Sequence, residues 1–584
     1  MQRLLISAAH KSSGKTTVTV GLCAALSARG LIVQPFKKGP DYIDPMWLAQ
    51  ASGRPCFNLD PYLSSESEIC DQFHCHSAQA DISLVEGNKG LYDGLALDGS
   101  NSNAALAHML DLPVVLVIDA RGMTRGIAPL ILGYQAFDKR IRISGVILNQ
   151  LGGARHESKL RAVIEHYTDV PVIGAIGHDP CLAVVERHLG LMPNHEMDDA
   201  ALRVRSMGDL ISSQVDLDRL RQAALVSTSP LPKISGAPST INLRAVTDEL
   251  SVRIGVVQDK AFGFYYPDDL LAIKDACAEI VPINTLRDAV LPNLDGLFIG
   301  GGFPEMFMAE LEANKSMRAS ICDAIQSGLP TYAECGGLMY LARTLRWKER
   351  SFEMVGALPV DVVMHERPVG RGYVELEPTQ NAPWNAGPDA AASVRGHEFH
   401  YSSLENVPSD LVYAYKVKRG HGIDGANDGI CYRNAVASYA HLRSSAGSEW
   451  ASQFVAFVKK MKTSLASEAS TRTRQIIING KLVQTDAEGY LINTHEWSED
   501  FATASAKVEN LELTAAHWQV ILFLRTYFEE HQVQAQVRAM IRHFSTVWGP
   551  ELGNNHHLHT LFPMGGPQKQ GNRLAGLLKT KGEH

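Results

Sequence analysis

Cys335 lies in the sequence PTYAECGGLMY (330–340), where a strand-like segment ends in a cysteine and two glycines follow at once. This pattern is typical of a nucleophile elbow, a tight turn that projects the side chain and directs backbone N–H groups at a developing oxyanion. The start of a following helix favours the thiolate form of the cysteine. An isolated cysteine is more often a buried core residue, but the adjacent glycines favour a catalytic nucleophile.

A second glycine cluster lies upstream, in LFIGGGFPE (297–305). Three glycines permit a backbone turn that a Cβ atom would obstruct, and they can supply a further donor to the oxyanion. His441 follows a strand-like segment in SYAH (438–441) and is the predicted general base, which takes the thiol proton and returns it to the leaving amine. We expect the oxyanion site to comprise Gly301, Gly302 and Gly336.

These motifs resemble the glutaminase module of class I glutamine amidotransferases, and in particular its cobyrinic acid a,c-diamide synthase branch. The resemblance rests on GGFPE, AECGG and the closing histidine, together with RGHEFHYS (395–402). It implies a flavodoxin-like α/β fold. In many class I enzymes a glutamate follows the histidine by two positions, but in this sequence Arg443 occupies that place. The cobyrinate branch also lacks this glutamate, so the difference agrees with the resemblance to that branch. The group that orients His441 is therefore left unassigned.

The N-terminus carries the pattern of a phosphate loop. RLLISAA (3–9) reads as a buried strand, AHKSSGKT (9–16) follows with Ala9 at the usual first glycine, and an apolar helix comes next. Backbone N–H groups and the helix N-terminus hold phosphate, Lys15 neutralises the outer phosphates and Thr16 ligates magnesium. The predicted ATP-binding residues of this loop are Ser12, Ser13, Gly14, Lys15, Thr16 and Thr17.

Charged residues follow the next two predicted strands. In FKKGPDYIDP (36–45), Asp41 or Asp44 could hold magnesium, and Lys37 or Lys38 could meet a phosphate or a substrate carboxylate. ISLVE (82–86) ends a third strand with Glu86, as a second magnesium ligand would. Charged turns are usually solvated, but groups at strand ends beside a phosphate loop favour a site.

This region resembles the synthetase half of the cobyrinic acid a,c-diamide synthases, whose fold is related to dethiobiotin synthetase. The matching segments are FKKGPDYIDP, EGNKGLYDG (86–94), GVILN (145–149) and ERHLGL (186–191). The resemblance implies that Thr16, Asp41 and Glu86 ligate magnesium and that Asn149 reads the adenine. It assigns substrate binding and activation to Lys38, Tyr42, Ile43, Asp44 and Asp93.

The two resemblances together imply an ATP- and glutamine-dependent amidation. ATP converts a poor acyl donor, a carboxylate, into an acyl phosphate, and ammonia released from glutamine at Cys335 replaces the phosphate. The implied small molecules are ATP with Mg²⁺, glutamine and a tetrapyrrole carrying side-chain carboxylates. Cobyrinate a,c-diamidation is the expected reaction.

A different kind of domain is predicted at the C-terminus. IIINGKLVQ (476–484) reads as a hairpin with its turn at Asn479 and Gly480, and LTAAHWQVILFLR (513–525) reads as a helix with Thr514 as its N-cap. With Trp497, GYL (489–491) and LFP (561–563), these segments resemble the mainly α-helical DsrC/TusE sulfur carriers.

That family carries sulfur on cysteines near the C-terminus, where this chain has Asn572 and Glu583 and no cysteine after Cys431. We therefore expect a docking or regulatory module, with sulfite reductase or a sulfur-relay protein as the partner. The association with dissimilatory sulfite reductase makes sirohaem, the cofactor of that enzyme, an alternative substrate.

Length and composition suit a multidomain enzyme. The chain has 584 residues and a net charge of −8, so no global basic field indicates nucleic acid or an anionic membrane. The phosphate loop and nine scattered cysteines indicate the cytoplasm. The predicted segments are a synthetase domain (1–195), a helix and linker (196–250), a glutaminase domain (251–445), a linker (446–474) and the DsrC/TusE-like domain (475–584).

Two other classes of protein remain open from the sequence. One is a regulatory P-loop ATPase with an inactive glutaminase-like domain, against which Cys335, the glycine turn and His441 speak together. The other is a sulfur-relay protein, which the absence of a cysteine in the tail opposes.

Overall fold

The structure is a computed structural model. It describes residues 2–179, 186–187, 190–197, 199–224, 251–384, 393–445, 448–472, 474–478 and 481–578. The chain forms two compact units, Met1–Lys460 and Met461–His584. The predicted turn at Asn479 and Gly480 and the position of Glu583 lie outside the described residues.

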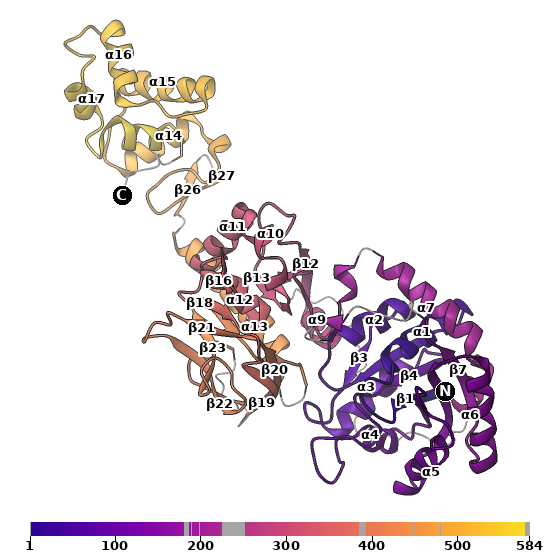
Figure 1. Cartoon of the computed structure of the whole chain (residues 1–584). Helices are drawn as coiled ribbons and strands as arrows, with labels where there is room; N and C mark the ends of the chain where they lie inside the picture. The colour runs from indigo at the N-terminus through magenta and orange to yellow at the C-terminus, as the bar shows by residue number, and fades with distance from the viewer. Residues whose placement is uncertain are drawn as a thin grey trace. The chain divides into compact units, whose positions relative to one another are not determined.

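The first part of unit 1 is built on a parallel seven-stranded sheet in the order β3-β2-β4-β1-β5-β6-β7 (Figure 1). Nearly every residue of the central strands is buried, as expected of a parallel sheet covered on both faces. The strands are β1 (Gln2–Ala8), β2 (Val33–Lys38), β3 (Phe57–Leu59), β4 (Ile82–Glu86), β5 (Val114–Asp119), β6 (Ile143–Leu151) and β7 (Val172–Gly177).

Helices cover both faces of this sheet and enclose two apolar cores. One face carries α1 (Lys15–Ala28), α2 (Ile43–Ser52), α7 (Ala200–Gln214) and α8 (Leu217–Ala224). The other carries α3 (Glu66–Ser77), α4 (Asn103–Met109), α5 (Ile127–Phe137) and α6 (Ala154–Tyr167). α7 and α8 lie within the segment 196–250, for which a helix and a linker are predicted.

The second part of unit 1 contains a ten-stranded sheet in the order β12-β10-β13-β15-β24-β23-β22-β19-β20-β25. Its first five strands are parallel to one another and the others pair antiparallel. The strands are β10 (Val252–Val257), β12 (Ala278–Ile283), β13 (Gly296–Ile299), β15 (Thr331–Glu334), β19 (Gly370–Pro378), β20 (Val394–His400), β22 (Val412–Arg419), β23 (Asn427–Tyr432), β24 (Ala435–Ser438) and β25 (His441–Leu442).

Smaller elements complete this part. A four-stranded sheet contains β16 (Thr344–Trp347), β17 (Arg350–Glu353), β18 (Asp361–Met364) and β21 (Ser402–Glu405), and β11 (Phe262–Phe264) pairs with β14 (Gly301–Gly302). The helices are α9 (Pro267–Asp275), α10 (Met308–Ala313), α11 (Lys315–Gln326) and α12 (Gly336–Leu341). They pack into two further cores of buried apolar residues.

The segment 446–474, predicted as a linker, is instead largely helical. α13 spans Trp450–Arg472, and Trp450, Phe454 and Val458 are all buried against the second sheet. These residues recur every four positions, so one face of the helix packs on the core. The composition rich in Ser, Thr and Ala suggests a linker, but these residues do not prevent a helix whose N-terminal half is packed.

Unit 2 begins with the antiparallel strands β26 (Arg474–Ile478) and β27 (Lys481–Thr485), which confirm the predicted hairpin strands. Thr514 is the N-cap of α15 (Ala515–His531), as predicted. The His517 ring joins this cap to the Leu561 carbonyl, with Nε2 2.8 Å from that oxygen. The other helices are α14 (Glu499–Val508), α16 (Val537–Val547), α17 (Asn555–Leu561) and α18 (Asn572–Leu574).

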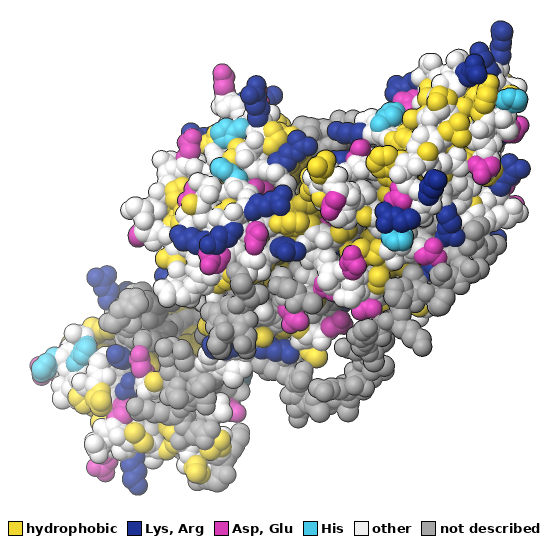
Figure 2. All heavy atoms as spheres, turned by 90° about the horizontal axis from the view of Figure 1, so that it is seen from below, with side chains coloured by type: hydrophobic (Ala, Val, Ile, Leu, Met, Phe, Trp, Pro, Cys, Tyr) yellow, Lys and Arg dark blue, Asp and Glu magenta, His cyan; other side chains and the backbone are white. Residues whose placement is uncertain are grey.

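Charges of both signs are interspersed on the face shown in Figure 2 and do not gather by sign. That face therefore carries no extended basic field. Within the described residues, no helix has the length and apolar character needed to span a bilayer.

Candidate active site

Cys335 occupies a strained turn between β15 and α12. Its φ of 47° and ψ of −100° are rare for a residue with a side chain, and its N–H donates to the Ser438 carbonyl at 2.7 Å. The side chain is 7% exposed and lines a cavity. A strained backbone held by the neighbouring strand is what the predicted elbow requires.

The predicted oxyanion glycines lie against this elbow. A Cβ atom at Gly336 would be 3.0 Å from the Gly302 nitrogen, so the two backbones approach closely. A Cβ atom at Gly301 would be 2.5 Å from Cε1 of His441, and one at Gly302 would collide with the Ala261 carbonyl. Glycine is therefore needed at these positions for steric reasons.

His441 is nearly buried and faces Glu334, the residue immediately before Cys335. His441 Nδ1 lies 3.4 Å from Glu334 Oε2, and both side chains are under 5% exposed. Glu334 Oε1 is held by the Tyr332 hydroxyl at 2.9 Å and the Leu442 N–H at 2.9 Å. Glu334 thus supplies the carboxylate that the sequence left unassigned.

The charges around His441 raise its pKa. Burial acts to lower the pKa, but the Cys335 and Glu334 side chains outweigh this effect and raise it to about 10. The imidazole is therefore protonated at neutral pH. A thiolate paired with an imidazolium is ready for nucleophilic attack and for proton donation to a leaving group.

The predicted phosphate loop lies between β1 and α1. Ser12 and Gly14 have φ values of 65° and 79°, and the Ser13 hydroxyl donates to the His10 carbonyl at 2.8 Å. Asn149, at the end of β6, donates to the Ser13 carbonyl at 2.9 Å, while its Oδ1 is buried without a hydrogen-bond partner in the described structure. Lys15, Thr16 and Thr17 open α1, where free N–H groups favour an anion.

A compact cluster of charges sits beside this loop. Lys37 Nζ lies 2.5 Å from Asp44 and 3.1 Å from Glu86, and the Thr16 hydroxyl lies 2.6 Å from Glu86 Oε1. Lys15 Nζ is 3.4 Å from Glu86. Burial acts to lower the pKa of Lys37, but Asp44 and Glu86 raise it well above its usual value. Lys37 therefore stays protonated between these two carboxyl groups.

Asp41 lies at the edge of the charge cluster. Its Oδ1 accepts the N–H groups of Ile43 and Asp44 at 3.0 and 3.2 Å. Burial and the neighbouring Asp44 carboxylate raise its pKa to about 7. Among the described residues no set of three or more His, Cys, Asp or Glu side chains is arranged to hold a metal alone. A cation here would therefore also need the Thr16 hydroxyl or phosphate oxygens.

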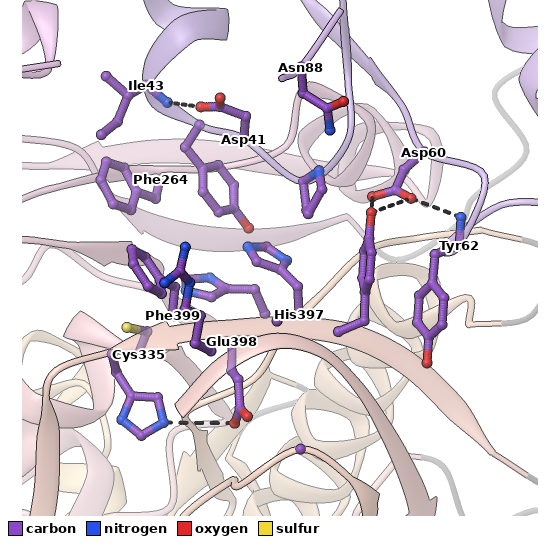
Figure 3. Close-up of a pocket in the computed structure, with 18 of the residues that line it drawn as sticks. Asp41, Ile43, Asp60, Tyr62, Asn88, Phe264, Cys335, His397, Glu398 and Phe399 are labelled. Carbon is purple, nitrogen blue, oxygen red and sulfur yellow. Dashed lines mark hydrogen bonds and ion pairs between the residues drawn. The ribbon is translucent and has the colours of Figure 1, made fainter. Parts of the chain in front are cut away.

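One cavity of about 750 Å³ joins the two halves of unit 1. Figure 3 shows Asp41, Asn88 and Asp60 on one side and Cys335, His397 and Phe399 on the other. The Tyr42 ring stacks on Phe264 at 5.2 Å and lies 5.2 Å from the His441 ring. The volume suits a small-molecule site. Of the predicted site residues, the cavity is lined by Lys38, Asp41, Tyr42, Ile43, Asp93, Gly302, Cys335 and His441.

The remaining predicted residues gather elsewhere. Asp44 and Glu86 belong to the charge cluster with Lys37 and do not line the cavity.

The structure also brings residues to the site that sequence analysis missed. An acid inside the strand segment YAE (332–334) was the signal for Glu334, and His397 lies within the motif RGHEFHYS. No local signal marked Asp60, Tyr62, Arg371, Tyr373 or Arg419, which line the cavity from distant segments.

Three family profiles match the chain. Residues 2–184 match an AAA domain, 253–448 a CobB/CobQ-like glutamine amidotransferase domain and 477–582 a DsrC-like protein. A phosphate-loop domain joined to a glutaminase defines a glutamine-hydrolysing amidotransferase ligase that uses ATP, and this is the class of the present enzyme.

Curated relatives give the family. A cobyrinate a,c-diamide synthase of Magnetococcus marinus is 45% identical over 449 residues, which cover 77% of this chain and 95% of the relative. That of Methanosarcina barkeri is 41% identical over 490 residues and covers 79% and 97%. The chain belongs to the cobyrinate a,c-diamide synthase family.

The C-terminal unit also has solved relatives. DsrC of Allochromatium vinosum is 43% identical over 19% of this chain and 99% of that chain, with a TM-score of 0.18. The DsrC-like profile matches residues 477–582, whereas the Magnetococcus marinus synthase covers 77% of this chain.

Proposed function

We propose that this protein amidates side-chain carboxylates of a tetrapyrrole in the manner of a cobyrinate a,c-diamide synthase, with ATP as activator and glutamine as the nitrogen source. The observation that carries this proposal is the shared cavity, which has Cys335 and His441 on one side and Asp41, Tyr42 and Ile43 on the other. Ammonia released at the cysteine would reach the activated carboxylate without crossing bulk solvent.

The glutaminase step begins with attack of the Cys335 thiolate on the glutamine carboxamide carbon. Backbone N–H groups near Gly302 and Gly336 stabilise the oxyanion. His441, oriented by Glu334, gives its proton to the departing ammonia. Water then attacks the thioester with His441 as base, and glutamate leaves with the thiolate restored.

The synthetase step forms and consumes an acyl phosphate. A substrate carboxylate oxygen attacks the terminal phosphorus of ATP and ADP leaves; ammonia then attacks the acyl carbon and phosphate leaves. Lys15 and the N-terminus of α1 hold the phosphates. Lys38 lines the cavity, and burial lowers its pKa to about 8. Its ammonium group can therefore orient the carboxylate at neutral pH.

Magnesium fits the oxygen-rich side of the charge cluster. Glu86 Oε2 is buried without a hydrogen-bond partner in the described structure, and oxygen ligands suit this ion. Thr16, Asp41 and Glu86 are the residues that would hold it. When bound, the ion neutralises charge on the transferred phosphoryl group.

Sirohaem is the second candidate acceptor, and the DsrC-like domain at 477–582 is the observation that favours it. The sequence has no cysteine after Cys431, so this domain cannot carry a persulfide on a cysteine. We infer that it docks the enzyme to a protein of sulfur metabolism.

The test is incubation with ATP, magnesium, glutamine and either cobyrinate or sirohaem, followed by mass spectrometry. Each amidation replaces OH by NH₂ and lowers the product mass by about one unit. The Cys335→Ser variant is expected to lose glutamine-dependent amidation and to keep amidation with ammonium. Glutamine turnover at the same rate in this variant and the wild type would overturn the role of Cys335.

A further inference from the structure

Three arginines lie on adjacent strands of the second sheet, and two of them line the cavity. Arg371 lies on β19, Arg395 on β20 and Arg419 at the end of β22. Glu375 of β19 is the cross-strand neighbour of both Arg395 and Arg419, so the arginines come from neighbouring strands. Arg371 and Arg419 line the cavity. The sheet therefore concentrates positive charge at one side of the site.

Aromatic rings fix the positions of these arginines. The guanidinium carbons of Arg395 and Arg419 each lie 5.3 Å from the centre of the Tyr62 ring, and that of Arg371 lies 5.4 Å from the Phe399 ring. A guanidinium that stacks on a ring keeps its in-plane N–H donors free for a carboxylate. Arg371 and Arg419 are therefore preorganised for anions, whereas Arg395 Nη1 donates to the Tyr62 carbonyl at 3.3 Å.

Among the residues that the structure describes, no carboxylate is paired with the three arginines. Within the described part of the chain, none of them forms an ion pair, including with Glu375. Two acids that line the cavity, Asp60 and Glu398, are already held by other donors. Asp60 accepts from the Tyr373 hydroxyl and the Tyr62 N–H at 3.0 and 2.9 Å. Glu398 accepts two backbone N–H groups at 2.7 and 2.8 Å.

We propose that Arg371 and Arg419 form a subsite for carboxylates of the substrate other than the one being amidated. This inference rests on the proposed function, because a tetrapyrrole with several carboxylates is the substrate that would use it. Bidentate arginine–carboxylate pairs are strong and directional. The subsite would anchor distal carboxylates and so select which one reaches Lys38 and Asp41.

The same chemistry could instead serve a phosphate of ATP. The phosphate loop already provides a separate phosphate site at the start of α1. The Michaelis constants for the two substrates distinguish a tetrapyrrole carboxylate from an ATP phosphate as the ligand. If the ligand is a carboxylate, loss of an arginine raises KM for the tetrapyrrole. If the ligand is a phosphate, the same change raises KM for ATP.

The test measures KM for cobyrinate, sirohaem and ATP in full-length Arg371→Gln, Arg419→Gln and the double variant. We expect each single change to raise KM for the accepted tetrapyrrole about tenfold or more, since each removes a charge-assisted hydrogen bond. Arg419→Lys keeps the charge without the planar fork and should fall between wild type and Arg419→Gln. Binding of the methyl ester of the accepted tetrapyrrole should be equal in wild type and variants.

Arg350→Gln is the matched control. Arg350 also stacks on an aromatic ring, with its guanidinium carbon 4.7 Å from Phe352, but it does not line the cavity. An unchanged KM for the accepted tetrapyrrole in the double variant would overturn the subsite alone. A rise only in KM for ATP would overturn it in favour of a phosphate site. A wild-type enzyme that neither binds nor amidates either tetrapyrrole would overturn the proposed function and the subsite with it.

Discussion

Glu334 and Cys335 are consecutive residues at the end of β15, and both meet His441. The strand directs Glu334 to Nδ1 of the ring at 3.4 Å, while the turn after it directs the thiol into the cavity. The carboxylate orients the imidazole and stabilises its protonated form, the same role that an acid has in other nucleophile–histidine sites.

The alkaline limb of the glutaminase pH profile tests this role. The leaving ammonia needs the His441 proton, so the rate falls as pH rises through the His441 pKa of about 10. Glu334→Gln removes a charge that raises this pKa, and the fall should begin about one unit lower. Glu349→Gln, at an exposed turn, should leave the profile in place. Identical alkaline limbs in wild type and Glu334→Gln would disprove the assignment.

At the scale of elements, a buried ion pair of the glutaminase half meets the synthetase half through Gln72. Arg443, which follows His441 by two residues, lies 2.6 Å from Asp268 at the start of α9. Gln72 of α3 donates to the same carboxylate at 2.8 Å. Arg443, which stands in place of the usual glutamate, also donates to Gln72 Oε1 at 3.1 Å and so contacts α3 of the synthetase half.

Asp268→Asn should destabilise unit 1 markedly. The change leaves the Arg443 charge buried without its partner, which costs about 3 kcal/mol of unfolding free energy. Glu377→Gln, in an ion pair with Lys418 whose side chains are 45% and 54% exposed, should cost under about 1 kcal/mol. Denaturant unfolding of both variants gives the comparison, and equal losses would show that the buried pair has no special weight.

Local motifs account for what could be predicted from the sequence. The phosphate loop, the elbow at Cys335 and the capped helix after Thr514 depend on neighbours along the chain, and each is read from a few residues. The arginine cluster could not be predicted, because residues 371, 395 and 419 meet only through strand pairing. The role of Glu334 likewise depends on β15 lying beside β24, with Glu334 opposite Ser438.

At the scale of the whole molecule, the proposed active site lies entirely within residues 1–460. The match to the Magnetococcus marinus relative covers 95% of that protein but only 77% of this chain. That relative is therefore almost fully matched without a counterpart of the DsrC-like domain at 477–582. The added domain is therefore not part of the chemical machinery of this family.

Truncation after Arg472 tests that separation and keeps α13 whole. The shortened enzyme should retain kcat and KM for the tetrapyrrole within about twofold, since no proposed site residue is removed. Steady-state kinetics with mass-spectrometric product detection measures both constants. A loss of amidation in a truncated protein that still unfolds cooperatively would place a required residue in the tail.

Because Glu334 and Cys335 are adjacent at the end of the same strand, an error in the register of that strand affects both residues. Side chains alternate between the two faces of a strand, so a slip of β15 by one residue would move both groups at once. Such a molecule would lose the nucleophile and its supporting acid together. A chain with β15 out of register would therefore not hydrolyse glutamine. It would release no ammonia in the absence of an activated carboxylate to accept it.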